Sequence, residues 1–135
     1  MIEARSTFRS PREVLFALCK RQDWKCAYCG QEMSFDGASS LTPAIEHIIP
    51  IVRAGRSEPD NLAAACRTCN SSKGDLTAIE YRAREKLRAA EALGDMKDRL
   101  IAKAEFFEAR AKCLAEEAAR YAAEACGLRQ IAGPL

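Results

Sequence analysis

Two Cys-x-x-Cys pairs constrain what this chain can fold into more than any other feature of its sequence. Cys26 and Cys29 form the first pair, and Cys66 and Cys69 form the second. A spacing of two residues lets both sulfurs of a pair reach one ion at a distance of about 2.3 Å. Two such pairs therefore predict a four-thiolate zinc site, and the stretch between them is where a reactive group would be held.

Composition and charge set the broad class of protein. The chain has 135 residues, seven cysteines and a net charge of +2. An odd number of cysteines, four of them in close pairs, favours zinc in a reducing cytoplasm over a disulfide scaffold. The near-neutral charge excludes a general polyanion-binding character, so any basic surface must be local. No apolar run approaches the length of a membrane span and no signal peptide is visible, which predicts a cytoplasmic protein with no membrane partner.

Local patterns predict an α+β fold in the part of the chain that carries the cysteine pairs. Ser10 can cap a helix over residues 11–21, with Pro11 at its first position. A β-branched run predicts a short strand over 44–49, and a short helix is predicted over 67–73. A domain of this size buries only a modest core, so a bound metal would stabilise it where that core is thin.

The chain is predicted to divide into a zinc domain over residues 1–76, a helical extension over 77–127 and a tail over 128–135. The extension opens on a capping-box signature at Thr77, and Gly127 is predicted to stop it. The sequence leaves open whether the extension is one long helix or two, because a Gly-Asp step interrupts the helical pattern.

Apolar residues recur in the extension at alternating spacings of four and three. This heptad seam consists of Leu100, Ala104, Phe107, Ala111, Leu114, Ala118, Tyr121 and Ala125. Its large side chains would be costly to leave in water, so the seam needs a partner. The candidates are residues 78–93 folded back, the zinc domain, or a second copy of the chain. We predict a homodimer through residues 96–126, because the segment 78–93 is only about half as long.

The stretch between the cysteine pairs contains the one histidine of the chain. His47 follows Glu46 in an apolar run that is stopped by Pro50. A neutral imidazole can take a proton from water near pH 7, and a carboxylate with an amide oxygen suits Mg²⁺. Asn70 can supply the amide oxygen, and Asn61 can hydrogen-bond the backbone near His47. Taken singly, each residue is more often structural, the histidine in a core and the asparagine at a cap.

Taken together, these residues resemble the HNH endonuclease family in its four-cysteine form, over about residues 20–75. The resemblance is carried, in family order and spacing, by the first cysteine pair, Glu46-His47-Ile48-Ile49-Pro50, Gly55, Asn61-Leu62 and Cys66-x-x-Cys69-Asn70-x-x-Lys73-Gly74. Two positions depart from the family pattern. Most members carry aspartate where this chain has Glu46, which bears on metal preference. Ala54 replaces the first glycine of a common Gly-Gly pair, which affects the loop.

The resemblance implies a ββα-metal fold on a treble-clef zinc scaffold and a DNA endonuclease activity. It implies that His47 is the general base and that Asn61 positions the His47 loop. Glu46 and Asn70 would hold the catalytic divalent ion, Mg²⁺ or Mn²⁺, while zinc remains structural. Attack by the activated water would leave a 5′-phosphate and a 3′-hydroxyl.

Four basic side chains flank this predicted site and are candidates for contacts to DNA phosphates: Arg53, Arg56, Arg67 and Lys73. For each of them the alternative is an ordinary solvated charge. Two other functions stay open, a non-catalytic zinc module that binds nucleic acid and an assembly or adaptor protein built around the helical extension. The presence of His47 with both asparagines favours the nuclease, because zinc binding requires none of the three.

Overall fold

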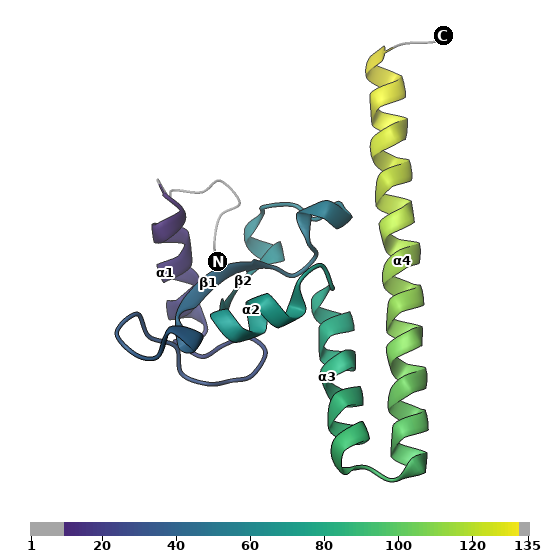
Figure 1. The fold of residues 1–135 in the computed structure, drawn as a ribbon. Coiled ribbons are helices and arrows are strands. Elements are labelled where there is room, and N and C mark those ends of the chain that lie inside the picture. Colours follow the sequence, from purple (N-terminus) through teal and green to yellow (C-terminus); the bar gives the residue numbers. More distant parts are fainter. Residues whose placement is uncertain (1–9, 133–135) are drawn as a thin grey trace. The chain divides into compact units, whose positions relative to one another are not determined.

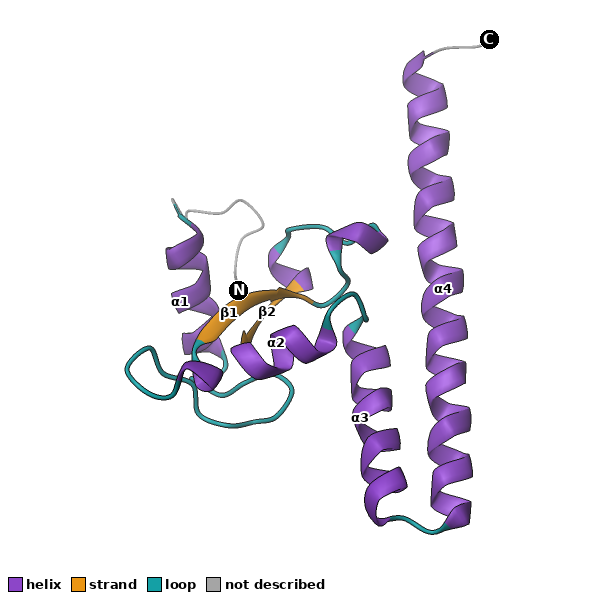
Figure 2. Cartoon of the chain, viewed as in Figure 1, coloured by secondary structure: helices purple, strands orange, loops and turns teal. Residues whose placement is uncertain are grey.

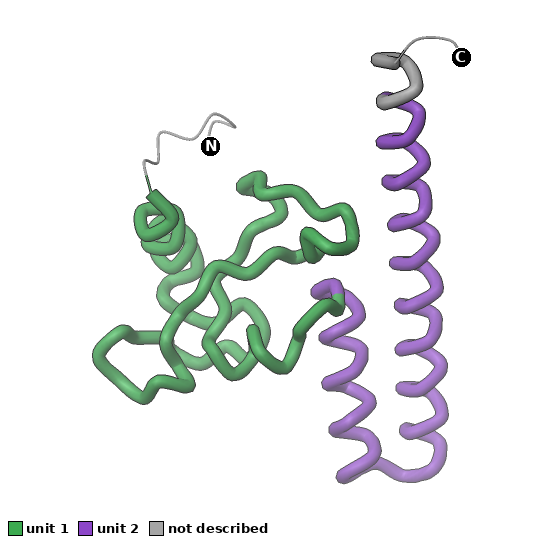
Figure 3. The backbone as a smooth tube through the Cα atoms, turned by 45° about the horizontal axis from the view of Figure 1, so that its top comes forward, with its two compact units in different colours: residues 1–76 green, residues 77–135 purple. Residues whose placement is uncertain are grey.

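The computed structural model describes residues 10–132, with side chains described for residues 10–127 (Figure 1). The chain divides into two compact units, Met1–Leu76 and Thr77–Leu135 (Figure 3). Within residues 10–132, the first unit contains a two-stranded sheet, two α-helices and three short 3-10 helices, and the second contains two α-helices (Figure 2). The prediction of an α+β fold followed by a long helical segment is confirmed.

The first helix, α1, spans Pro11–Arg21, as the sequence predicts. The Ser10 hydroxyl accepts a hydrogen bond from the Glu13 backbone N–H at 3.3 Å, which satisfies one of the free donors of the first turn. Leu18 and Cys19 are buried on the inner face of the helix. Cys19 is therefore a small core residue, separate from the two cysteine pairs.

The sheet consists of β1 (Pro43–His47) and β2 (Leu62–Cys66), which are antiparallel. The register pairs Pro43 with Cys66 and His47 with Leu62. All five residues of β2 are buried. This strand is not predicted from its own residues, because a run of alanines has little strand propensity and forms a strand only through pairing and burial. The first strand ends at His47, two residues before the predicted end at residue 49.

The short helix α2 spans Arg67–Lys73 and follows β2 directly. Its N-cap is Cys66, whose sulfur accepts a hydrogen bond from the Cys69 backbone N–H. Gly74 follows with a positive φ of 53°, so the helix ends at the residue that the sequence predicts. The order strand, strand, helix places His47, Cys66 and Cys69 on adjoining elements.

The second unit consists of α3 (Ala78–Leu93) and α4 (Met96–Ala132). The capping box is present at Thr77 and Glu80, and the break between the helices falls at Gly94. Asp95 then accepts a hydrogen bond from the Asp98 backbone N–H at 2.9 Å, which caps the new helix. The open question of one helix or two is therefore decided in favour of two.

The prediction that Gly127 stops the last helix is wrong, because α4 continues to Ala132. A glycine inside a helix costs only about 1 kcal/mol relative to alanine. It ends a helix when the chain turns away in a left-handed conformation, and Gly127 is not among the residues with positive φ. Within residues 10–132, none of the helices combines the length and the apolar content of a membrane span.

The two helices of this unit pack on each other, but not through the heptad seam. Ala102 and Cys113 of α4 are buried, and Arg110 pairs with the buried Glu80 of α3 at 2.9 Å. The large seam residues remain exposed, with relative exposures of 61% for Leu100, 59% for Phe107, 48% for Leu114 and 46% for Tyr121. Residues 78–93 therefore fold back onto α4, but they pack on a face of α4 that does not contain the seam.

Candidate functional site

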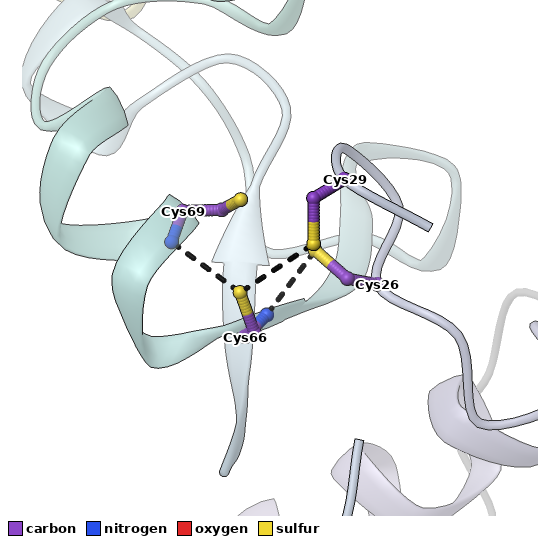
Figure 4. A group of neighbouring side chains, drawn as sticks. All are labelled: Cys26, Cys29, Cys66 and Cys69. Atoms are coloured by element: carbon purple, nitrogen blue, oxygen red, sulfur yellow. Dashed lines mark hydrogen bonds between the residues drawn. The ribbon is translucent and has the colours of Figure 1, made fainter. Parts of the chain in front are cut away.

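The four paired cysteines converge on one point in the first unit (Figure 4). The sulfurs of Cys26, Cys29, Cys66 and Cys69 all lie within 4.8 Å of one another. The sulfurs of Cys29 and Cys66 are 3.8 Å apart. Tetrahedral ligands about 2.3 Å from one ion lie about 3.8 Å from each other, so this arrangement fits a zinc ion.

Backbone N–H groups point at the sulfurs of this cluster. Cys26 Sγ accepts from Tyr28 N at 3.4 Å and from Cys66 N at 3.3 Å. Burial alone would raise the pKa of the Cys26 thiol, but donors from Cys66, Cys29 and Tyr28 outweigh it and lower the pKa from 9.0 to about 7. Burial raises the pKa of the Cys29 thiol. The cluster therefore contains at least one sulfur that is readily available as a thiolate, the form that binds metal.

The cluster joins three parts of the chain. Cys26 and Cys29 lie in a knuckle closed by a Cys26 N to Gln31 O bond at 2.9 Å, with Gly30 at a φ of 72°. The Ala27 backbone N–H donates to Ala64 O at 3.1 Å and so attaches the knuckle to β2. The second pair comes from the end of β2 and the first turn of α2. Metal binding by these four residues would lock the knuckle, the sheet and α2 together.

Glu46 lies in β1 and is only 3% exposed. Its Oε2 accepts a hydrogen bond from the Tyr28 hydroxyl at 2.5 Å, and its Oε1 forms an ion pair with the Lys73 ammonium. Lys73 is also buried, and its Nζ donates to the His47 backbone carbonyl at 2.9 Å. A buried charge is costly unless it is paired, so Lys73 is the counterion that allows Glu46 to lie inside the fold.

His47 is the last residue of β1 and is partly exposed, unlike the buried Glu46 beside it. Its Nε2 lies 2.9 Å from the Ser57 hydroxyl, which belongs to the loop after β1. The two side chains leave the strand on opposite faces, as successive residues of a strand do. They are nevertheless connected through Lys73, which contacts the carboxylate of one and the carbonyl of the other.

Asn61 holds the loop that follows His47. Its Oδ1 accepts from Ile49 N at 2.9 Å, and its Nδ2 donates to Ile49 O at 3.0 Å and to Arg56 O at 2.8 Å. Gly55 is required in the same loop, because a Cβ there would lie 1.8 Å from the Ile49 carbonyl oxygen. The side chain of Asn61 thus satisfies the backbone N–H and C=O of Ile49, which lies just past the end of β1.

Asn70 and Lys73 share one face of α2, since residues three apart are neighbours on a helix. Asn70 is partly buried, in the same helix as the zinc-cluster residue Cys69. Because Lys73 reaches Glu46 and His47, the α2 face that carries Asn70 is turned toward β1. The three residues predicted at the reactive site therefore come from two adjoining elements, β1 and α2.

The four predicted phosphate-contacting residues fall into two groups. Arg56 and Arg67 are exposed, and Arg56 lies 3.7 Å from the Glu58 carboxylate. Arg53 is 7% exposed and its Nη1 donates to Asp75 O at 3.4 Å, while Lys73 is buried against Glu46. In this arrangement only the first group presents its charge to solvent.

Two residues of this site were missed by sequence reasoning. Tyr28 sits inside the first cysteine pair, where an aromatic side chain is expected to pack over the metal, yet its hydroxyl reaches Glu46. Ser57 lies in a polar loop with no distinguishing signal, yet it contacts the imidazole. Both contacts join residues that are distant in sequence, so only the folded chain reveals them.

Comparison with known proteins agrees with the motif. Residues 26–76 match the sequence profile of a family described as HNH endonuclease, so the resemblance is confirmed over that segment. The chain is 39% identical over 59 residues to the CRISPR-associated endonuclease Cas9 of Corynebacterium diphtheriae. This match covers 42% of the present chain and 5% of that protein, so the chain spans only a small part of its relative. No solved structure matches the chain.

Proposed function

We propose, from the premise that residues 26–76 form an HNH endonuclease domain, that this protein hydrolyses DNA phosphodiester bonds in a divalent-metal-dependent reaction. The observation that supports the proposal is the contact of α2 with β1 beside the four-cysteine cluster, where Lys73 of α2 pairs with Glu46 and donates to the His47 carbonyl. The products are a 5′-phosphate and a 3′-hydroxyl.

His47 acts as the general base in this proposal. In the tautomer that we propose, the Nε2–H of His47 donates a hydrogen bond to the Ser57 hydroxyl, 2.9 Å away, and the lone pair of Nδ1 takes a proton from water. Lys73 fixes the backbone at the same residue through the His47 carbonyl. The imidazole is thus held from the ring and from the main chain, and it directs the attack of water in line with the leaving 3′ oxygen.

Glu46 and Asn70 are the residues that would hold the catalytic ion, Mg²⁺ or Mn²⁺. A carboxylate and an amide oxygen are the hard donors that both ions accept, and the buried setting of Glu46 gives its carboxylate a fixed position. When bound, the ion supplies positive charge that stabilises the phosphoryl and leaving oxygens. Asn61 keeps the loop after His47 in register through its three bonds to Ile49 and Arg56.

Arg56 and Arg67 are the basic residues that we assign to contacts with DNA phosphates. Both are exposed, and a guanidinium offers several donors to phosphate oxygens. Arg53 and Lys73 are buried, and they bind the Asp75 carbonyl and the Glu46 carboxylate instead. We also propose that the protein works in a reducing compartment such as the cytoplasm, which the free thiols of the cluster support.

We further propose that the protein forms a homodimer through the heptad seam of α4. Leu100, Phe107, Leu114 and Tyr121 all remain exposed after α3 has packed on α4. Burying such side chains is worth roughly 1.5–3 kcal/mol each, and the intervening alanines allow two helix axes to approach closely. A dimer would carry two nicking sites and would suit cleavage of both strands or of a branched junction.

Incubation of the purified protein with supercoiled, linear and branched DNA tests the proposed activity. Nicking that requires Mg²⁺ or Mn²⁺ and stops on their removal, with structural zinc retained, is the expected result. Binding of DNA without cleavage would instead support a non-catalytic zinc module. Binding of a partner protein with neither DNA binding nor cleavage would support an assembly or adaptor function.

A further inference from the structure

The Glu46 carboxylate has both oxygens engaged, and its two partners differ in charge. Tyr28 donates a neutral hydroxyl to Oε2 at 2.5 Å, whereas the Lys73 ammonium pairs with Oε1. Glu46 and Lys73 are 3% and 2% exposed. A divalent cation that binds the carboxylate would therefore have to replace Lys73, whereas Tyr28 could stay in place.

The position of the Tyr28 hydroxyl is set by the zinc knuckle. Tyr28 lies between Cys26 and Cys29, and its backbone N–H donates to Cys26 Sγ at 3.4 Å. The adjacent Ala27 is bound to Ala64 of β2 at 3.1 Å. The tyrosine ring thus extends from the edge of the four-cysteine cluster to the carboxylate in β1, so the geometry of the cluster is transmitted to Glu46 through a single side chain.

The two partners respond differently to an arriving divalent cation. Two cations on one carboxylate oxygen repel each other strongly in a buried site, where the effective dielectric constant is low. A hydroxyl that donates to the other oxygen carries no net charge and loses nothing when the cation binds. Carboxylates that ligate metals are usually held in this way by an outer hydrogen-bond donor.

We propose that Tyr28 is a positioning residue, which fixes Oε2 of Glu46 so that Oε1 faces the divalent ion, and that Lys73 occupies Oε1 only while the ion is absent. This inference rests on the proposed function, because it takes Glu46 as a ligand of the catalytic ion. Lys73 retains a second acceptor, the His47 carbonyl, when it leaves the carboxylate. Metal loading and the Lys73–Glu46 ion pair are therefore mutually exclusive.

Mn²⁺ binding to the zinc-loaded full-length protein tests the proposal without relying on activity. The free Mn²⁺ signal in electron paramagnetic resonance gives the affinity of wild type and of Tyr28→Phe, which removes one hydroxyl. We expect Tyr28→Phe to bind Mn²⁺ about 10- to 100-fold more weakly, the range found when an outer-shell partner is removed. Its zinc content should match that of the wild type, and its thermal unfolding should remain cooperative, although loss of a buried hydrogen bond lowers the midpoint.

Two further variants separate this effect from general damage. Tyr81→Phe removes the same atom from a buried tyrosine of α3 and should leave Mn²⁺ affinity unchanged. Lys73→Gln removes the competing cation and should bind Mn²⁺ more tightly than wild type, opposite in sign to Tyr28→Phe. If Lys73→Gln does not fold, the comparison of Tyr28→Phe with Tyr81→Phe decides the matter.

Three results would overturn the proposal: wild-type Mn²⁺ affinity in Tyr28→Phe, equal Mn²⁺ affinity in wild type and Glu46→Gln, or loss of zinc from Tyr28→Phe. The last would make the tyrosine a part of the zinc scaffold alone. Plasmid nicking by the wild type is scored separately. A protein that binds Mn²⁺ as described but cuts no DNA would refute the nuclease function and leave the roles of Tyr28 and Lys73 standing.

Discussion

The imidazole of His47 is restrained at two points. The ring nitrogen Nε2 lies 2.9 Å from the Ser57 hydroxyl. The backbone carbonyl of His47 accepts a hydrogen bond from the Lys73 ammonium at 2.9 Å. The loop that follows is held by Asn61. In the proposed reaction, an imidazole fixed in this way would need little reorganisation before it takes a proton, which favours general-base catalysis.

Replacement of His47 by alanine should therefore remove cleavage with little effect on folding. Loss of a positioned base costs about 10²–10⁴-fold in rate. Plasmid nicking at saturating Mg²⁺ measures the rate, and circular dichroism together with a DNA gel shift shows whether fold and binding persist. Wild-type cleavage by His47→Ala would rule out the assigned role.

Ala54 departs from the common family glycine at a cost in stability. Its φ is 62°, in the left-handed region that disfavours residues with a Cβ by about 1–2 kcal/mol. It follows the turn Ile51–Arg53 and precedes the obligatory Gly55. The position requires a glycine-like conformation, although the residue that occupies it is alanine.

Ala54→Gly should accordingly raise the free energy of unfolding by about 1 kcal/mol, because the relief of strain exceeds the added entropy of the unfolded chain. Urea denaturation of the zinc-loaded protein measures the change. The matched control is Ala17→Gly inside α1, which should lower stability by about 1 kcal/mol. Equal shifts in the same direction would show that the left-handed conformation carries no strain.

The elements of the first unit are short, and the cysteine cluster connects them. The sheet has two strands of five residues and α2 has seven, so hydrogen bonding alone holds little of this unit together. The cluster adds a cross-link between the knuckle, β2 and α2. Zinc is thus expected to contribute a large share of the folding free energy.

Cys66→Ser should unfold the first unit. Apparent zinc binding of about 10–16 kcal/mol equals or exceeds the whole stability of a typical small domain. Zinc content and the near-ultraviolet signal of Trp24, in the first unit, report the result. Cys126→Ser makes the same change at an exposed cysteine of α4 and should keep both. A Cys66→Ser protein that folds cooperatively without metal would contradict a structural role for zinc.

At the scale of the whole molecule, the helical unit offers an apolar face that its own packing leaves open. Ala102 and Cys113 of α4 are buried, the Cys113 sulfur lies 3.2 Å from the hydroxyl of Thr77 at the start of α3, and the Glu80–Arg110 pair joins the two helices. The heptad seam lies on another face and remains exposed. An exposed apolar seam of this length is typical of helices that associate with a second chain.

The proposed homodimer predicts that Leu114→Glu yields a monomer, because a charge placed in the seam cannot be buried without a partner. Light scattering at micromolar concentration measures the mass of wild type and variant. Leu93→Glu introduces the same charge at the most exposed leucine of α3 and should leave the dimer intact. A monomeric wild type, with size and stability unaffected by Leu114→Glu, would refute the dimer.

The sequence by itself determined the features that depend on local spacing. These features are the Cys-x-x-Cys pairs, the helix caps at Ser10 and Thr77, and the helix end at Gly74. Each depends on residues only a few positions apart, so each can be predicted from the sequence. The family resemblance over residues 26–76 follows from the same kind of pattern.

Only the tertiary structure decided the features that depend on contacts between distant residues. An alanine-rich segment became the buried strand β2 because β1 and α1 lie against it. Lys73 is buried because it pairs with Glu46, which lies 27 residues earlier in the chain. The Tyr28 hydroxyl donates a hydrogen bond to the same carboxylate. Burial and ion pairing depend on what surrounds a side chain in space, and neither the residue type nor its spacing along the chain specifies those surroundings.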